Sequence, residues 1–145
     1  MSSSLPAKSS SIYDCVILPL GKIHNPAGNL TVVEGQKNLP FEVQRIYYLY
    51  DVPGGQTRGG HGHKQLSQLI VAAGGSFDVL LDDGMNKKVV TLNRPNVGLL
   101  VVPGIWRELL EFSSGSVCLV LASCKYDEAD YIRDYTEFKE FKCTM

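Results

Sequence analysis

Hydrophobic residues along this chain fall in short runs, separated by turn-forming residues about every ten positions. The runs that predict strands cover residues 15–20, 30–33, 41–50, 66–72, 76–81, 88–92, 98–102 and 116–122. Turn material such as residues 25–29 and 82–84 lies between neighbouring runs. Because the strands are short and no helical pattern alternates with them, the sequence predicts an all-β sandwich or barrel.

The run at residues 41–50 carries aromatic residues at both parities. Side chains alternate between the two faces of a strand. The two predicted faces consist of Arg45, Tyr47 and Leu49, and of Ile46, Tyr48 and Tyr50. Aromatic residues on each side predict that both faces are buried.

Only the two ends depart from the strand pattern. Residues 1–11 are rich in serine and too poor in apolar side chains to offset the entropy of ordering them, so a disordered leader is expected. Tyr131, Tyr135 and Phe138 recur at helical spacing behind Asp127, which can cap a helix. A short amphipathic helix within 127–141 is therefore predicted, with packing favoured over a role as a lid. With 145 residues, of which 44% are hydrophobic, residues 12–145 are expected to form a single domain.

Net charge and cysteine content limit the classes of binding partner and the cellular compartment that are expected for this chain. A net charge of −1 gives no electrostatic reason for binding nucleic acid or an anionic membrane. No apolar run reaches the roughly 18 residues of a membrane span, and the first residues lack the apolar centre of a signal peptide. The four cysteines form no Cys-x-x-Cys pair, which favours reduced thiols. A cytoplasmic protein is expected.

One stretch carries a recognisable spacing. Gly55, His61, His63, Gln68 and Gly75 follow the pattern Gly-x5-His-x-His-x4-Gln-x6-Gly, which is similar to the first signature of the cupin barrel. In metal-binding cupins the position of the glutamine is a glutamate that joins the histidines as a ligand. Among all-β barrels, this similarity selects the cupin-type jelly roll, here with a short C-terminal helix.

The second cupin signature is Pro-x-Gly-x-x-His, and this chain matches it only at the glycine, Gly104. Val102 takes the proline position and Arg107 takes the position of the last histidine ligand. A guanidinium offers hydrogen-bond donors and a permanent positive charge but no lone pair for a cation. The sequence therefore predicts paired histidines without a metal ion.

His61 and His63 lie two residues apart, so on a strand both point to the same side. They are either ordinary buried polar groups or a catalytic pair. Because histidine titrates near neutral pH, a pair without metal suits proton transfer between neighbouring atoms of a substrate, and acid-base catalysis is favoured. Gly59, Gly60 and Gly62 are interpreted as clearing the backbone for a ligand.

Other candidates each have two interpretations. Arg107 forms a surface salt bridge or, pointing inward, stabilises a developing oxyanion. The Tyr47 ring belongs to the core or presents its hydroxyl inside the barrel. Arg45 and Arg58 bind phosphate or are solvated. Gln68 is interpreted as orienting a substrate hydroxyl or a histidine.

Several motifs together are close to one family. They are Arg-Gly-Gly-His-Gly-His-Lys at 58–64, Trp-Arg-Glu at 106–108 and Tyr-Ile-Arg-Asp-Tyr at 131–135, supported by the runs 45–51, 81–84 and 117–123. From about residue 13 to 141 the chain resembles the nucleotide-sugar 3,4-ketoisomerases, small cupins that act on dTDP-4-keto-6-deoxy-D-glucose. The resemblance implies a homodimer with exchanged N-terminal strands, no cofactor, and a product that an aminotransferase converts to a 3-amino-3,6-dideoxyhexose for a surface glycan such as lipopolysaccharide.

The resemblance also implies a mechanism, in which the carbonyl moves from C4 to C3 through an enediol or enediolate. His61 would act as the base on the carbons and His63 would serve the oxygens, with Tyr47 as the third catalytic residue. The side chains expected to bind substrate are Arg45, Arg58, Lys64, Gln68 and Arg107.

Ala27 is a departure from the family, which can carry a larger polar residue there that acts with the residue at position 107 to set stereochemistry. Arg107 favours the gluco product, but Ala27 supplies no polar contact, so the residues leave both configurations at C4 open. Two rival functions share the fold. A dTDP-sugar 3,5-epimerase would use a single histidine with an aspartate partner, and a non-catalytic nucleotide-sugar-binding cupin would share everything except turnover.

Overall fold

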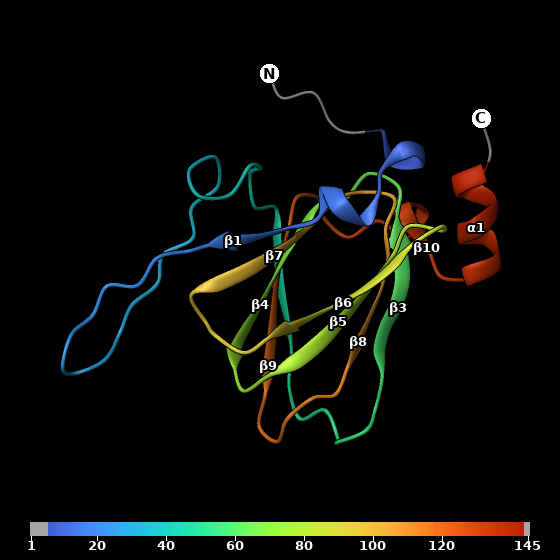
Figure 1. Cartoon of the computed structure of the whole chain (residues 1–145). Helices are drawn as coiled ribbons and strands as arrows, with labels where there is room; N and C mark the ends of the chain where they lie inside the picture. Colours follow the sequence, from blue (N-terminus) through green and yellow to red (C-terminus); the bar gives the residue numbers. More distant parts are fainter. Residues whose placement is uncertain (1–5, 144–145) are drawn as a thin grey trace.

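Two antiparallel five-stranded sheets face each other in the computed structural model, which describes residues 6–143 (Figure 1). The first sheet has the order β1 (Val16–Pro19), β7 (Val97–Val101), β4 (Gln68–Gly74), β9 (Val117–Ala122) and β2 (Arg45–Leu49). The second has the order β10 (Tyr131–Ile132), β3 (Arg58–His63), β8 (Trp106–Leu110), β5 (Phe77–Asp82) and β6 (Lys87–Leu92). Most successive strands after β2 change sheets, which confirms the predicted jelly roll.

The interior is built from the inward-facing side chains of both sheets. Ile70 and Val120 of the first sheet and Val79 and Leu109 of the second are all fully buried in one cluster. A second cluster, which includes Leu39, lies on the outer side of the first sheet, where residues 33–43 cover β4 and β9. Strand β4 is therefore buried on both faces, which explains its continuous apolar sequence.

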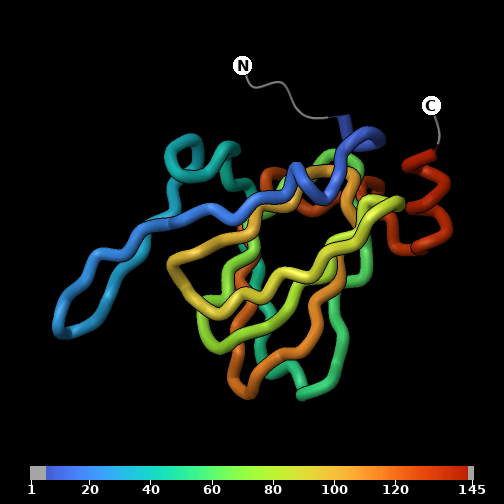
Figure 2. The backbone as a smooth tube through the Cα atoms, viewed as in Figure 1, coloured from blue at the N-terminus to red at the C-terminus, as the bar shows by residue number. Residues whose placement is uncertain are grey.

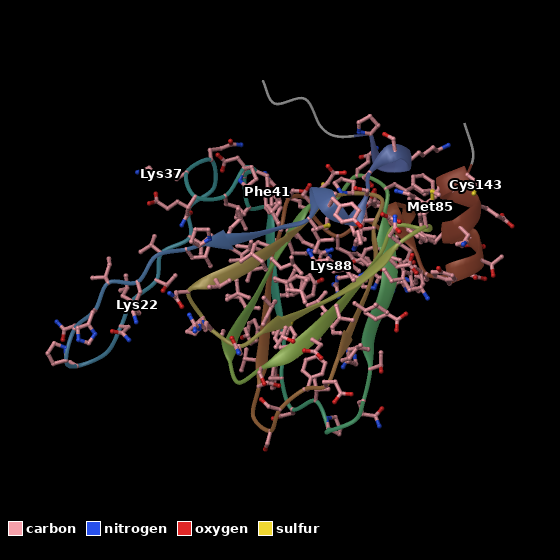
Figure 3. The ribbon with its side chains drawn as sticks, viewed as in Figure 1. Lys22, Lys37, Phe41, Met85, Lys88 and Cys143 are labelled. Atoms are coloured by element: carbon pink, nitrogen blue, oxygen red, sulfur yellow. The ribbon has the colours of Figure 1, made fainter. Side chains whose placement is uncertain are left out.

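The predicted strands differ from the observed sheets at β8 (Trp106–Leu110) and at residues 30–33. Strand β8 was missed because Arg107 and Glu108 interrupt its apolar pattern. Residues 30–33 form no strand, since Leu30 makes only a single bridge, to Ile23. The segment between β1 and residue 33 instead projects from the barrel (Figure 2), and Figure 3 shows Lys22 on it, away from the packed interior.

The prediction that β2 is buried on both faces was wrong. Ile46, Tyr48 and Tyr50 are 57%, 59% and 62% exposed. Strand β2 is the last strand of its sheet and, in the described part of this single chain, nothing covers its outer face. The inner face, with Tyr47, packs against the core.

The C-terminal region contains less helix than predicted. Asp127 does cap a helix, but only the one-turn η3 (Glu128–Asp130). Residues Tyr131–Ile132 then form β10, because they pair with β3, and α1 covers only Tyr135–Cys143. Phe138 of α1 is fully buried against Trp106, so the helix packs on the barrel as expected.

Part of the expected disordered leader is ordered. Residues Ala7–Ser9 form the one-turn helix η1, and η2 (Ile12–Asp14) follows it. The Nζ of Lys142 donates to the carbonyl oxygens of Ala7 and Ser10, both at 2.8 Å, so contacts with α1 stabilise a segment that has few apolar residues. Residues 1–5 of the predicted leader lie outside the described residues. No helix within the described range is long and apolar enough to cross a membrane.

Candidate active site

A β-bulge in β3 builds the site. Arg58 pairs with Leu109 and His61 pairs with Arg107, so three steps along β3 match two along β8. In a regular strand Arg58 and His61 would face opposite sides, and the extra residue lets both face the same pocket. Gly59 makes this possible, since its φ is +72° and a Cβ there would lie 2.5 Å from Nη1 of Arg107.

The other glycines of the motif serve the packing of the chain itself. A Cβ on Gly60 would lie 3.5 Å from the Trp106 ring, and one on Gly62 would lie 3.1 Å from the Phe138 ring. Gly62 faces α1, opposite to the histidines on either side of it. At Gly60 and Gly62 protein side chains lie against the backbone, so the interpretation that these two glycines admit a ligand finds no support, whereas Gly59 does line the pocket.

The two histidines share one face, as predicted. His61 is 8% exposed and His63 is 3% exposed, and their ring centroids lie 4.9 Å apart with the planes at 89°. Burial, followed by the positive charge of Arg107, lowers the pKa of His61 to about 2. Burial also lowers the pKa of His63, although a hydrogen bond with Asp130 opposes this shift. Both rings are therefore neutral at pH 7, and the Nε2 of each has no partner among residues 6–143.

Buried neutral histidines make the fold sensitive to acid. Since His61 has a pKa of about 2 in the folded chain and one of about 6.5 when unfolded, the unfolded state binds an extra proton as the pH falls below about 6.5. The free energy of unfolding should then fall by about 1.4 kcal/mol per pH unit for this residue. Urea unfolding at pH 6.5 and pH 5.0 should show a loss roughly 1.6 kcal/mol larger in the wild type than in His61→Asn, because the unfolded histidine is already half protonated at pH 6.5. Equal losses in the two proteins would contradict this assignment.

Arg107 is buried at the centre of the site, with 1% of its surface exposed. Its Nε donates to Oε1 of Gln68 at 3.0 Å, and its Nη2 donates to the Tyr47 hydroxyl at 2.8 Å. Its Nη1 has no partner in the described part of the chain. Arg107 therefore points inward, and its expected role toward a developing oxyanion stays a prediction. Gln68 orients this guanidinium rather than a histidine.

Tyr47 combines core packing with a polar contact. Burial raises the pKa of its hydroxyl, although the charge of Arg107 opposes the shift, so the group stays protonated at neutral pH. Because its oxygen accepts from Arg107, its own hydrogen is available to a ligand.

The metal site of metal-binding cupins does not fit these residues. Arg107 holds its guanidinium where the last histidine ligand would stand, and it also engages the oxygen of Gln68. Two imidazole nitrogens are left as donors, beside a fixed positive charge. Structural and catalytic zinc sites use at least three protein donors.

We therefore expect EDTA to leave the turnover rate unchanged, because the positive charge of Arg107 opposes a cation beside the histidines. The check is turnover before and after dialysis against EDTA, with the metal content of the purified protein measured in parallel. Stoichiometric metal whose removal abolishes turnover would overturn this expectation.

A pocket of about 250 Å³ lies between β2 of the first sheet and the β3 and β10 edge of the second. Its lining consists of Arg45, Tyr47, Leu49, Arg58, Gly59, His61, Arg107, Tyr131 and Arg133. Four of these are arginines, so the pocket favours an anion. A larger surface hollow of about 410 Å³, lined by residues such as Lys22 and Arg94, contains no histidine.

Three predicted site residues do not line this pocket. Gln68 is one of them, and its side chain accepts from Nε of Arg107 instead. His63 is absent from the lining and lies beneath it, against the rings of His61 and Tyr131. Lys64 is exposed and borders a separate hollow beside α1 with Ile132 and other residues, because it follows His63 and points the opposite way. The geometry therefore does not support Lys64 as a substrate-binding residue.

The sequence analysis missed the contribution of β10 and its flanking residues. The Tyr131 ring lies 4.4 Å from that of His63 and 5.1 Å from that of His61, measured between centroids. Arg45 donates to the Tyr131 hydroxyl at 3.1 Å, and Arg133 lies 4.3 Å above the same ring. The motif at 131–135 had carried part of the family resemblance, so its residues were available as candidates. They were not considered as site residues because the sequence analysis assigned them to a packing helix.

Known proteins share this fold and sequence. The family model FdtA, described as WxcM-like, C-terminal, matches residues 13–143. The TDP-4-oxo-6-deoxy-alpha-D-glucose-3,4-oxoisomerase of Aneurinibacillus thermoaerophilus is 46% identical over 125 residues, which cover 86% of this chain and 90% of that protein.

Two solved structures are also similar. A 3,4-ketoisomerase from Helicobacter canadensis has a TM-score of 0.87 and 44% identity, covering 89% of this chain and 97% of that one. QdtA, a sugar 3,4-ketoisomerase from Thermoanaerobacterium thermosaccharolyticum in complex with TDP, has a TM-score of 0.87 and 39% identity, covering 90% and 95%. The barrel, its histidine pair and these similarities define a cupin-type sugar isomerase. Within that class, the chain belongs to the FdtA-like family of sugar 3,4-ketoisomerases, which confirms the resemblance.

Proposed function

We propose that this chain moves the keto group between C4 and C3 of dTDP-4-keto-6-deoxy-D-glucose. The observation that carries the proposal is the pair of buried, neutral imidazoles, each with a bare Nε2, beside a guanidinium with one free amino group. An unpaired buried polar group costs about 1 to 3 kcal/mol. Sugar hydroxyl and carbonyl oxygens are suitable partners for all three groups.

The proton transfers balance without a cofactor. His61 takes the proton from C3, the C–H electron pair forms the C3–C4 double bond, and negative charge develops on O4. His63, whose ring lies 4.9 Å from that of His61 behind the pocket lining, carries the O3 proton to O4, a step that requires the bound sugar to reach its Nε2. The electron pair left on O3 then forms the new carbonyl, and the double-bond pair takes the proton held by His61 at C4. Arg107 and Tyr47 donate to the oxygen that carries charge.

The diphosphate is assigned to the arginines at the pocket entrance. Arg45 and Arg58 line the same pocket as His61, and arginine binds phosphate oxygens through paired N–H donors. Arg133 also lines the pocket, but its Nε and Nη2 donate to Glu128 at 2.7 and 2.9 Å, so it adds charge rather than free paired donors. That a related ketoisomerase has been crystallised with TDP supports this assignment.

Incubating the purified protein with dTDP-4-keto-6-deoxyglucose in D₂O, followed by NMR, tests the proposal. Carbonyl migration to C3 is the expected result, with deuterium at C4 to the extent that the proton held by His61 exchanges with the solvent. Deuterium at C5 would identify a 3,5-epimerase, a possibility raised by the aspartate partner of His63. Neither carbonyl migration nor exchange at any carbon would identify a binding protein without catalysis. Couplings of the ring protons in a product formed in H₂O distinguish gluco from galacto configuration.

We further propose that the product feeds an aminotransferase that makes a 3-amino-3,6-dideoxyhexose for a surface glycan such as lipopolysaccharide. The expected location is the cytoplasm, where reduced thiols persist, since all four cysteines are free.

A homodimer is proposed because the chain exposes apolar surface at two places. Ile23 and Leu30 on the projecting segment are 63% and 54% exposed, and the outer face of β2 is similarly open. Strand β1 pairs with β7 of its own chain, so the part proposed to cross to a partner is residues 21–33, including Ala27, rather than 15–20.

Sedimentation at micromolar concentration should therefore give a dimer, because pairing buries these apolar side chains. Tyr48→Lys, on the outer face of β2, should weaken the dimer. Val89→Lys, on the outer face of β6, is a matched control because it is 54% exposed in the other sheet. A fully active monomer would refute the dimer proposal.

A further inference from the structure

Asp130, which sequence analysis did not single out, is the polar residue most closely tied to the end of the catalytic strand. Its Oδ2 lies 3.2 Å from Nδ1 of His63 and accepts from the backbone N–H of Leu66 at 3.3 Å. Its Oδ1 accepts from the N–H of Gln65 at 2.7 Å, and its carbonyl oxygen accepts from the N–H of Lys64 at 3.0 Å. One residue thus holds four consecutive residues, 63–66, in place.

The position of Asp130 is itself fixed by local structure. It ends η3, whose first residues are capped by the Asp127 side chain, and its backbone N–H donates to the carbonyl oxygen of Asp127 at 3.0 Å. The next residue, Tyr131, begins β10 and pairs directly with His63. The carboxylate therefore meets the imidazole in a fixed position.

The contact determines which nitrogen of His63 carries hydrogen. Burial opposes ionisation of Asp130, but hydrogen bonds from His63 and from the N–H groups of Gln65 and Leu66 hold its pKa below the usual value. An ionised carboxylate can only accept. The Nδ1 of a neutral His63 must then donate, which leaves the lone pair of its Nε2 bare, in agreement with the unpartnered Nε2. His61 has no carboxylate partner in the described part of the chain.

We propose that Asp130 is a positioning residue that makes the two histidines inequivalent. It holds His63 in the Nδ1–H tautomer and supplies the negative charge that its imidazolium needs when Nε2 takes the O3 proton. Without Asp130, that positive charge would form in a buried site that already holds Arg107. His61 stays the base for the carbons. The role of Asp130 in proton transfer rests on the proposed function. The tautomer of His63 does not depend on it.

The test is ¹⁵N NMR of the imidazole nitrogens without ligand, together with steady-state kinetics. The wild type should show His63 as the Nδ1–H tautomer. In Asp130→Asn the amide N–H can donate to Nδ1, so the hydrogen should move to Nε2 and kcat should fall by about 10²-fold or more, with KM and TDP affinity unchanged. Asp130→Glu should restore the tautomer and part of kcat. Asp127→Asn is the matched control, since asparagine also caps a helix, and should alter neither.

Each outcome decides the proposal. An Nε2–H tautomer in the wild type would overturn it, as would an Asp130→Asn protein whose tautomer changes while kcat stays within threefold. Loss of kcat with the tautomer unchanged would give Asp130 a purely structural role and also overturn it. If Asp130→Asn does not fold, the wild-type tautomer and the Asp130→Glu kinetics decide. A wild type with the Nδ1–H tautomer but no isomerisation would refute the proposed function while leaving the positioning of His63 intact.

Discussion

Replacing His61 or His63 by asparagine is expected to lower kcat by about 10² to 10⁴-fold, the usual cost of losing a general acid or base. Asparagine keeps a polar group of similar reach but cannot take up a proton at neutral pH. Both variants should still bind TDP, because Arg45 and Arg58 at the pocket entrance do not depend on either imidazole. Steady-state kinetics and calorimetric titration with TDP measure the two effects.

The two losses should differ in kind. If His61 works on carbon, His61→Asn should also stop exchange of the C3 proton with D₂O, whereas His63→Asn retains some exchange without delivering product. Lys87→Asn, a substitution on the exposed face of β6, is the control. Near-normal turnover in either histidine variant would remove that residue from the mechanism. Loss of TDP binding in both would recast the pair as a binding or folding element.

Much of the fold could be predicted because its strands follow simple rules. Strands such as β5 and β9 have apolar patterns that local periodicity detects. Strand β8 lacks such a pattern because its buried centre is Arg107, whose burial depends on Gln68 and Tyr47 from two distant strands. Periodicity alone does not anticipate a buried charge whose partners lie 39 and 60 residues away.

Some features of the candidate site could likewise be predicted from the sequence, and others could not. The shared face of His61 and His63 follows from their spacing, and it was confirmed. The role of Gly59 depends on a bulge, which exists only because β3 pairs with β8. Asp130 reaches His63 from 67 residues away, through the two-residue strand β10. Such a short strand leaves almost no periodic signal, so three-dimensional pairing was needed to find it.

Arg107 connects these observations, and its replacement carries the second large expected effect. Arg107→Lys should lower kcat by about 10² to 10³-fold, the range found when one donor to a developing oxyanion is removed. Lysine keeps the charge, but its single ammonium cannot hold Gln68 and Tyr47 and also present a free donor to the pocket. The measurement is kcat and KM with dTDP-4-keto-6-deoxyglucose, beside thermal unfolding to verify the fold.

A second variant separates charge from geometry. Arg107→Met removes the positive charge that helps to lower the pKa of His61, so this pKa should rise from about 2, as followed by NMR titration, although burial keeps it below its ordinary value. Arg107→Lys should shift it much less, because the charge stays. Arg94→Met, at an exposed site in a different hollow, is the matched control and should change neither kcat nor the pKa. Turnover of Arg107→Lys within threefold of the wild type would show that the position of the guanidinium does not matter, and would leave Tyr47 as the donor to the oxygen on which charge develops.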